Sequence, residues 1–134
     1  MREITSHRVN PANDMLTITA LDEPGSGGAS HLYSITGFNS KTNPSDPFVA
    51  WYDKPAQNST VLFQNGPIAE VGVNGVTHEA LLAILIDRLE AFQRGPFASA
   101  YNESALGALQ LAQMALQSRT RQRMARGVEG KHEV

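Results

Sequence analysis

The hydrophobic pattern of this 134-residue chain changes its period once, at Asn74-Gly75. Before that point apolar residues tend to alternate with polar ones, which is typical of half-buried β-strands. After it they recur every three or four residues, which is typical of amphipathic helices. The sequence therefore predicts an α+β fold, with an N-terminal antiparallel β-sheet in residues 1–75 and a two-helix hairpin with a short C-terminal tail in residues 76–134. We expect the two parts to form one compact unit.

The N-terminal part contains four segments with the composition of strands, and the last two are joined by the turn Asn65-Gly66-Pro67. These segments are Met15–Leu21, His31–Phe38, Thr60–Gln64 and Ile68–Val73. Residues 39–59 are rich in proline and predict a long loop or insertion, in which the apolar run Phe48–Tyr52 is a candidate edge strand. The glycine-rich segment 23–30 fits a plain hairpin loop, and it would also allow a ligand to approach the backbone closely.

Two N-cap signals divide the C-terminal part into helices. Thr77 and Ser99 can each cap a helix, and Gly95-Pro96 separates the two. The predicted helices, residues 77–94 and 99–126, would be about 25 Å and about 40 Å long. In an antiparallel hairpin, about 15 Å of the second helix would then extend beyond the first. This extension needs the sheet, or another subunit, to cover it.

The end of the second predicted helix carries an arginine stripe, which we define as Arg119, Arg123 and Arg126. Their i, i+4 and i+7 spacing places the three guanidinium groups on one helix face. Guanidinium groups can bind phosphate oxygens two at a time. Arginines at a helix C-terminus also complement the helix dipole as a solvated face. The spacing alone leaves both interpretations open.

The turn between the predicted helices places Phe92 and Phe97 close to Asn102. Aromatic rings beside an amide can stack on a base and hydrogen-bond its edge. The rings can equally close the end of the hairpin core. Asn102 and Arg119 are seventeen residues apart, hence about 25 Å apart on one helix. A dinucleotide-sized ligand that contacts both ends therefore needs two antiparallel chains, and a two-fold dimer would form two such sites.

Composition removes several classes of function. The chain has no cysteine, its four histidines lack metal-binding spacing, and it has no GxSxG motif, so we expect no catalytic residue, metal or cofactor. The net charge of −2 gives no general attraction to DNA, RNA or anionic membranes. The longest apolar run, Ala80–Ile86, is too short to span a bilayer, and the N-terminus has no signal-peptide pattern. We expect a soluble intracellular protein.

Several segments resemble the phage Thoeris anti-defence proteins of the first type, and the C-terminal hairpin resembles that of the phage anti-CBASS sponge of the second type. The segments are Leu21–Gly25, Gly27–Ala29, Phe63–Ile68, Glu70–Thr77, Glu79–Ile84, Ile86–Leu89, Phe92–Gln93, Gly95–Phe97, Asn102, Arg119–Arg121 and Arg126–Gly130. The resemblance covers most of the chain outside residues 39–59. Its most specific motifs are Phe-Gln-x-Gly-Pro-Phe and Arg-Gly-Val-Glu-Gly.

This resemblance implies a non-catalytic sponge in the cytoplasm of the infected bacterial host. Such proteins bind cyclised ADP-ribose (gcADPR) made by TIR-domain defence enzymes and keep it from its effector, and some also bind cyclic di- and trinucleotides. They are hexamers, built as trimers of dimers. Carried over by position, Phe92 would stack on the base, and Asn102 would hydrogen-bond the ligand. Arg119 and Arg123 of the partner chain would hold the phosphates, and Phe97 and Arg126 complete the candidate site.

Two other functions compete with this interpretation. One is an enzyme that degrades the same signal, for which the sequence offers no evident nucleophile, base or metal site. The other is an assembly protein that binds nucleic acid through its arginine helix, which would show steep salt dependence. The near-neutral net charge argues against the second.

Overall fold

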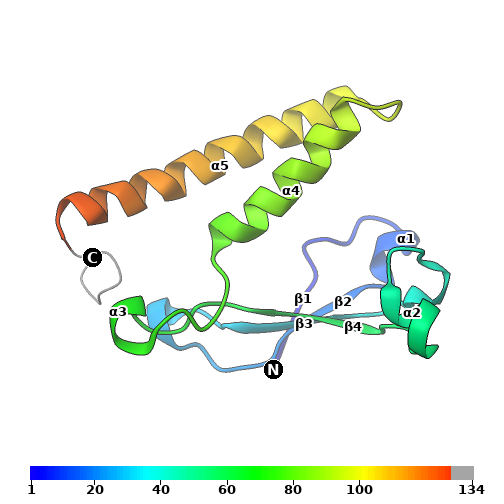
Figure 1. The fold of residues 1–134 in the computed structure, drawn as a ribbon, viewed down its shortest axis with the longest axis horizontal. Helices are drawn as coiled ribbons and strands as arrows, with labels where there is room; N and C mark the ends of the chain where they lie inside the picture. The colour runs from blue at the N-terminus through cyan, green and yellow to red at the C-terminus, as the bar shows by residue number, and fades with distance from the viewer. Residues whose placement is uncertain (128–134) are drawn as a thin grey trace. The chain divides into compact units, whose positions relative to one another are not determined.

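The computed structural model describes residues 1–127, which divide into two compact units with a boundary between Asn65 and Gly66. The first unit contains a four-stranded antiparallel sheet, and the second contains a helical hairpin (Figure 1). The predicted α+β class, with the sheet preceding the hairpin, is confirmed.

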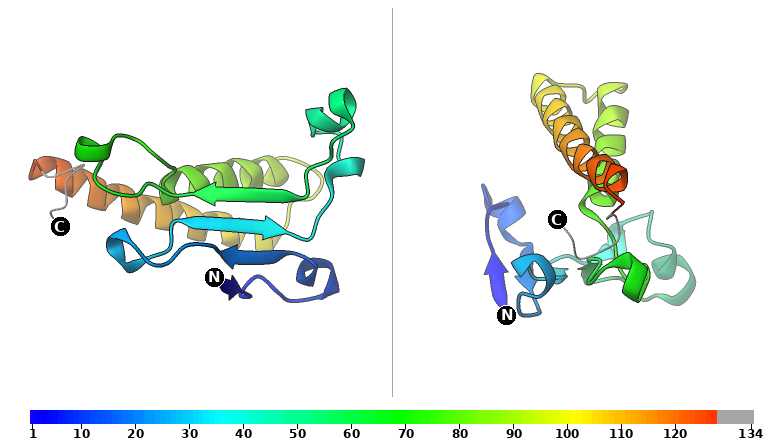
Figure 2. Two further views of the ribbon diagram at one scale, coloured as in Figure 1. Left: turned by 90° about the horizontal axis from the view of Figure 1, so that it is seen from below. Right: turned by 90° about the vertical axis from the view of Figure 1, so that its left-hand side faces the viewer.

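The sheet follows the chain order β1-β2-β3-β4, and every neighbouring pair is antiparallel (Figure 2). Its strands are β1 (Arg2–Ile4), β2 (Thr17–Ala20), β3 (Leu32–Thr36) and β4 (Asn58–Leu62). Ile18 lies opposite Ile4 on one side and Ile35 on the other, so three isoleucines form a row across one face. Such cross-strand apolar pairs are the main source of stability in a small sheet. The strands predicted to form β2, β3 and β4 are confirmed with different bounds, and β1 was not predicted.

The glycine-rich connection between β2 and β3 includes a short 3-10 helix, η1 (Ser26–Gly28). Asp22 fastens the base of this loop, because its carboxylate accepts hydrogen bonds from the backbone N–H groups of His31 and Leu32 at 3.0 Å. These hydrogen bonds hold the pKa of Asp22 below its ordinary value, because they stabilise the charged form of the carboxylate. The Leu32 N–H has the larger effect, and the His31 N–H adds to it. The segment is therefore a hairpin connection, as its composition suggested.

The edge strand predicted over Phe48–Tyr52 is wrong, because this segment forms the helix α2 (Pro47–Tyr52). The Asp46 carboxylate caps the helix by accepting a hydrogen bond from the Phe48 N–H at 2.9 Å. Pro47 occupies the first turn, where its missing N–H costs nothing. The Ser40 hydroxyl, from the 3-10 helix η2 (Ser40–Thr42), also donates to Asp46 and lowers the pKa of that carboxyl. The local cap thus outweighs the strand propensity of the aromatic run.

The strand predicted over Ile68–Val73 is also wrong, since the chain forms a single helical turn, α3 (Ile68–Val71). This turn ends at Gly72, whose φ of +77° a glycine adopts without strain. The Gly72 N–H donates to the Ile68 carbonyl at 2.9 Å, which closes the turn. The predicted hairpin of this segment with β4 is therefore absent from the described sheet. A further short helix, α1 (Pro11–Asp14), was not predicted.

The hairpin consists of α4 (His78–Gln93) and α5 (Ala100–Ala125), in agreement with the predicted helices to within one residue. Both predicted caps are present: the Thr77 hydroxyl accepts from the Ala80 N–H, and the Ser99 hydroxyl accepts from the Asn102 N–H, each at 3.1 Å. With 16 and 26 residues, the helices are about 24 Å and about 39 Å long. The end of α5 therefore extends beyond α4, as Figure 1 shows.

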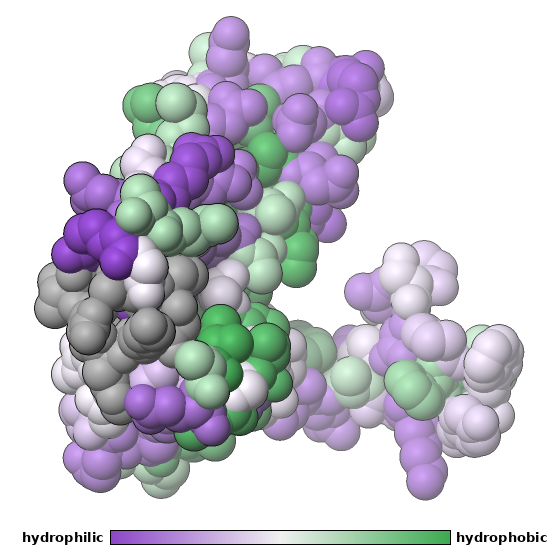
Figure 3. Space-filling view, turned by 60° about the vertical axis from the view of Figure 1, so that its left-hand side comes forward, coloured by the Kyte–Doolittle hydropathy of each residue, from purple (hydrophilic) through white to green (hydrophobic). Residues whose placement is uncertain are grey.

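The single chain buries little of its hydrophobic surface. Ala20 and Ile86 are the only hydrophobic residues of the described chain that are buried. On α5, Leu111 is 67% and Met114 is 60% exposed, and hydrophobic residues reach the surface on the face drawn in Figure 3. A monomer of this kind lacks the core that its 41% hydrophobic content would allow. None of the helices within residues 1–127 combines the length and apolarity needed to cross a membrane.

Candidate functional site

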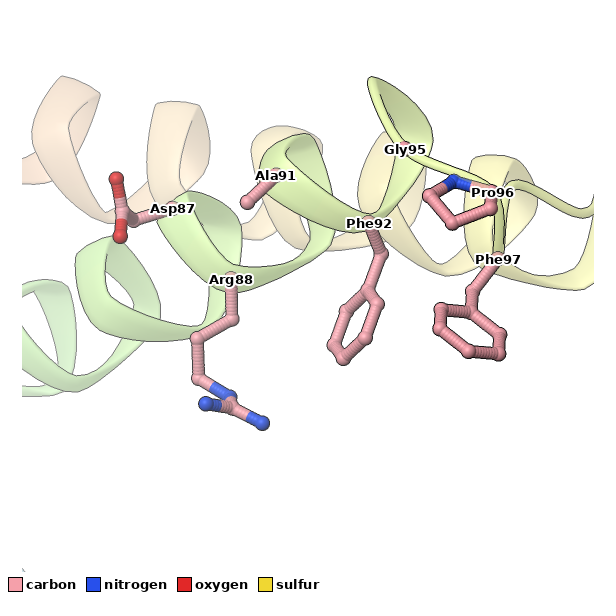
Figure 4. A pocket seen from close by; sticks show the side chains of 7 residues that line it. All are labelled: Asp87, Arg88, Ala91, Phe92, Gly95, Pro96 and Phe97. Carbon is pink, nitrogen blue, oxygen red and sulfur yellow. The ribbon is translucent and has the colours of Figure 1, made fainter. Parts of the chain in front are cut away.

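The turn between α4 and α5 holds an open pocket of about 410 Å³ (Figure 4). Its lining residues are Asp87, Arg88, Ala91, Phe92, Gly95, Pro96 and Phe97. The pocket therefore contains both aromatic residues that the sequence singled out. It also contains a charged pair of neighbours, Asp87 and Arg88, that the sequence argument did not use.

Two side chains hold the turn in place. The Gln93 side-chain amide forms two hydrogen bonds with the Ser99 backbone. Its Oε1 accepts from the Ser99 N–H at 3.0 Å, and its Nε2 donates to the Ser99 carbonyl at 3.2 Å. The Asn102 Nδ2 donates to the Phe97 carbonyl at 3.2 Å. The turn is thereby tied to a residue of α4 at Ser99 and to a residue of α5 at Phe97. These bonds hold the backbone of the turn, from which the pocket takes Gly95, Pro96 and Phe97.

Arg88, Phe92 and Phe97 form a row whose side chains extend from the hairpin to the same side, while Asp87 points elsewhere (Figure 4). The Arg88 guanidinium carbon lies 5.7 Å from the centroid of the Phe92 ring, within cation–π range. Phe92 is 39% and Phe97 is 73% exposed, so both rings are open to a ligand. An exposed aromatic row is suited to stacking on a planar base.

Asn102 is half-buried and does not line the pocket itself, but its side chain binds the backbone of Phe97, which does. Its backbone N–H is taken by the Ser99 cap, and one amide hydrogen is taken by the Phe97 carbonyl. The remaining amide hydrogen and Oδ1 can still bind a ligand, because an asparagine side chain has two donors and one acceptor oxygen. The structure thus adds a positioning role for Asn102 to the predicted contact with ligand.

The arginine stripe lies at the opposite end of α5. Arg119 and Arg126 are exposed and have no carboxylate partner among residues 1–127, and Arg123 is half-buried. Arg126 is the C-cap residue, followed by Gly127 with a φ of +72°, so the stripe runs to the end of the helix. The final residues of the predicted Arg126–Gly130 motif lie outside the described chain.

The structure brings Phe92, Phe97 and Asn102 together and keeps them away from the arginines. Since α5 is continuous from Ala100 to Ala125, Asn102 and Arg119 are about 25 Å apart along it. Sequence reasoning missed Arg88, although its i, i+4 spacing from Phe92 on a predicted helix was a usable signal.

No group of three or more His, Asp or Glu side chains within residues 1–127 could hold a metal ion. The two carboxylates whose pKa is lowered, Asp22 and Asp46, are engaged in loop and cap hydrogen bonds. A second, smaller pocket of about 220 Å³ lies between η2 and α2 and contains none of the predicted site residues.

Comparison with known proteins identifies the hairpin. Residues 56–121 match the family model of the Acb2/Tad1 hairpin domain, which includes the whole pocket and Arg119. The chain is also 48% identical over 75 residues to Thoeris anti-defense 1 of Bacillus phage SBSphiJ7, a stretch that covers 56% of this chain and 53% of the relative. The chain therefore spans about half the length of the curated relative that it matches. Residues 56–121 therefore carry the Acb2/Tad1 hairpin domain, and the chain is Tad1-like in sequence.

Proposed function

We propose that this protein is a phage anti-defence sponge that binds gcADPR from TIR-domain Thoeris enzymes and keeps it, uncleaved, from its effector. Cyclic di- and trinucleotides are further candidate ligands. The observation that carries the proposal is the separation of an aromatic half-site, at the turn between α4 and α5, from a stripe of arginines at the far end of α5. A nucleotide offers the complementary halves, a planar base and an anionic phosphate.

In the proposed complex the base stacks on Phe92 and Phe97 of one chain, and Asn102 binds its edge. Arg119 and Arg123 of a second chain hold the phosphates, and Arg126 lies next to them. This arrangement follows from distance, because about 25 Å separates the two halves within one chain. Two antiparallel hairpins related by a two-fold axis would form two identical composite sites.

The exposed hydrophobic side chains support an oligomer. Ile84 and Leu85 of α4 and Leu111 and Met114 of α5 are exposed in the single chain, so the hairpin leaves apolar surface on both helices. Burying a large side chain contributes about 1.5–3 kcal/mol, which is a strong drive for chains with such faces to associate. We propose a hexamer, built as a trimer of dimers, acting in the host cytoplasm.

Sequestration without catalysis can be tested by recovery of the ligand. Protein and gcADPR are mixed at known molar ratio, free ligand is measured after ultrafiltration, and the protein is then heat-denatured to release what it held. The proposal predicts that free gcADPR falls by a fixed number of equivalents per chain and that the released compound is chemically unchanged. Recovery of a cleaved product, or consumption beyond the molar amount of chains, would establish an enzyme instead.

Nucleic-acid binding is tested with the same preparation. The sponge predicts that an excess of double-stranded DNA or RNA leaves gcADPR binding unchanged at physiological salt. Competition that disappears between about 50 and 200 mM salt would indicate a phosphate-backbone binder.

A further inference from the structure

Arg88 is a charged residue of the pocket, and no carboxylate within residues 1–127 forms an ion pair with it. Its guanidinium carbon lies 5.7 Å from the centroid of the Phe92 ring, a cation–π contact. The adjacent Asp87 points away from it (Figure 4), so the two charges do not neutralise each other. An exposed guanidinium held beside an aromatic ring keeps its five N–H donors available for an anion.

The position of Arg88 differs from that of the arginine stripe. It lies one turn before Phe92 on α4 and therefore belongs to the aromatic half of the site. A base that stacks on the open surface of Phe92 brings its attached sugar and phosphate to the end of the hairpin where Arg88 lines the pocket. The long arginine side chain can turn from the ring to a phosphate with little change in the helix.

We propose, on the basis of the proposed function, that Arg88 is a phosphate-binding residue of the same nucleotide site. It would supply a cation from the base-stacking chain, opposite the arginines of the partner chain. The ligand would then be held by guanidinium groups from both chains. This arrangement favours ligands with two phosphate groups, such as a diphosphate or a pair of phosphodiesters, over ligands with one.

The experiment compares three variants with the full-length protein, using gcADPR as the probe and isothermal titration calorimetry at several NaCl concentrations. Arg88→Met removes the charge and keeps much of the side-chain bulk, and Arg88→Lys keeps the charge. Arg94→Met is the matched control, because Arg94 is an exposed arginine at the end of α4 that does not line the pocket. Oligomer mass is measured for each variant.

Arg88→Met should weaken gcADPR binding by about 10- to 100-fold, the range for a lost charge-assisted hydrogen bond. It should also flatten the dependence of affinity on NaCl, since one ion pair fewer is screened. Arg88→Lys should lose less affinity and keep the salt dependence, and Arg94→Met should match the original protein.

Two results would overturn the inference while the original protein still binds gcADPR. Arg88→Met could bind as tightly as the original, or it could bind more weakly with unchanged salt dependence, which would mean that Arg88 only packs against Phe92. If the original protein itself fails to bind gcADPR, the proposed function is refuted, and the role of Arg88 is refuted with it.

Discussion

Mixing two binding-defective variants should restore binding if each site is shared between chains. Phe92→Ala removes the stacking ring, and loss of one base–aromatic stack costs about 1–3 kcal/mol. Arg119→Ala with Arg123→Ala removes two charged contacts of about 1.5–3 kcal/mol each, which lowers affinity by at least about 100-fold. Each variant alone is therefore expected to bind gcADPR weakly, with its oligomer intact.

The distance along α5 determines what happens when the two variants are combined. Asn102 and Arg119 are about 25 Å apart in one chain, so the intact ring and the intact arginines of a site must come from different chains. In a randomly mixed oligomer, about a quarter of the sites combine Phe92 of one variant with both arginines of the other. These sites should bind with the original affinity.

The assay is co-expression of the two variants with different affinity tags, followed by purification through both tags and titration with gcADPR. Double-tag purification enriches mixed oligomers, so the recovered stoichiometry should be about a quarter of the original or slightly more. The control is each variant co-expressed with a second, differently tagged copy of itself, which should show no recovery. Mixed oligomers that bind no better than these controls would refute the shared site.

Three further variants test the pocket and the sheet. Asn102→Ala should weaken gcADPR binding by roughly 5- to 20-fold, because it removes the amide that binds the Phe97 carbonyl and that, in the proposed complex, also binds the ligand. Helix content by circular dichroism should stay unchanged, since the Ser99 cap uses the backbone N–H of residue 102. Gly37→Ala should destabilise the fold by roughly 2 kcal/mol or more in chemical denaturation, because φ is +93° there and a Cβ would lie 1.8 Å from the Met15 carbonyl oxygen; an unchanged midpoint would contradict this backbone geometry. Asp22→Asn should lower the melting temperature at neutral pH and have less effect in acid, because the lowered folded-state pKa of Asp22 gives stability that is present above about pH 4 and is lost as pH falls through the folded-state pKa; an equal loss at both pH values would show that the charge of Asp22 contributes nothing.

The helices were predictable because their signals are local. Thr77 and Ser99 form the expected cap hydrogen bonds at the starts of α4 and α5. The 3.6-residue period of the sequence follows each cap. The errors in the β-rich half arose where composition and capping disagreed. Phe48–Tyr52 has the residues of a strand, but Asp46 and Pro47 before it start a helix. An Asp-Pro pair before an apolar run was therefore the better guide.

The candidate site was predictable only in part. The sequence identified Phe92, Phe97 and Asn102 as neighbours because they surround one turn, and it separated them from the arginines by helix rise alone. It did not identify Arg88, whose role depends on which way a side chain on α4 points. Nor can periodicity show how much surface stays exposed, and the exposed faces of α4 and α5 became evident only from the structure.

The central claim is that several chains together hold an intact signal molecule, and native mass spectrometry during a gcADPR titration tests it most directly. The account predicts a hexamer that gains one unchanged gcADPR per chain, because each two-fold pair forms two sites. A monomer that binds gcADPR with full affinity, or an oligomer that gains only the mass of a cleavage product, would contradict it.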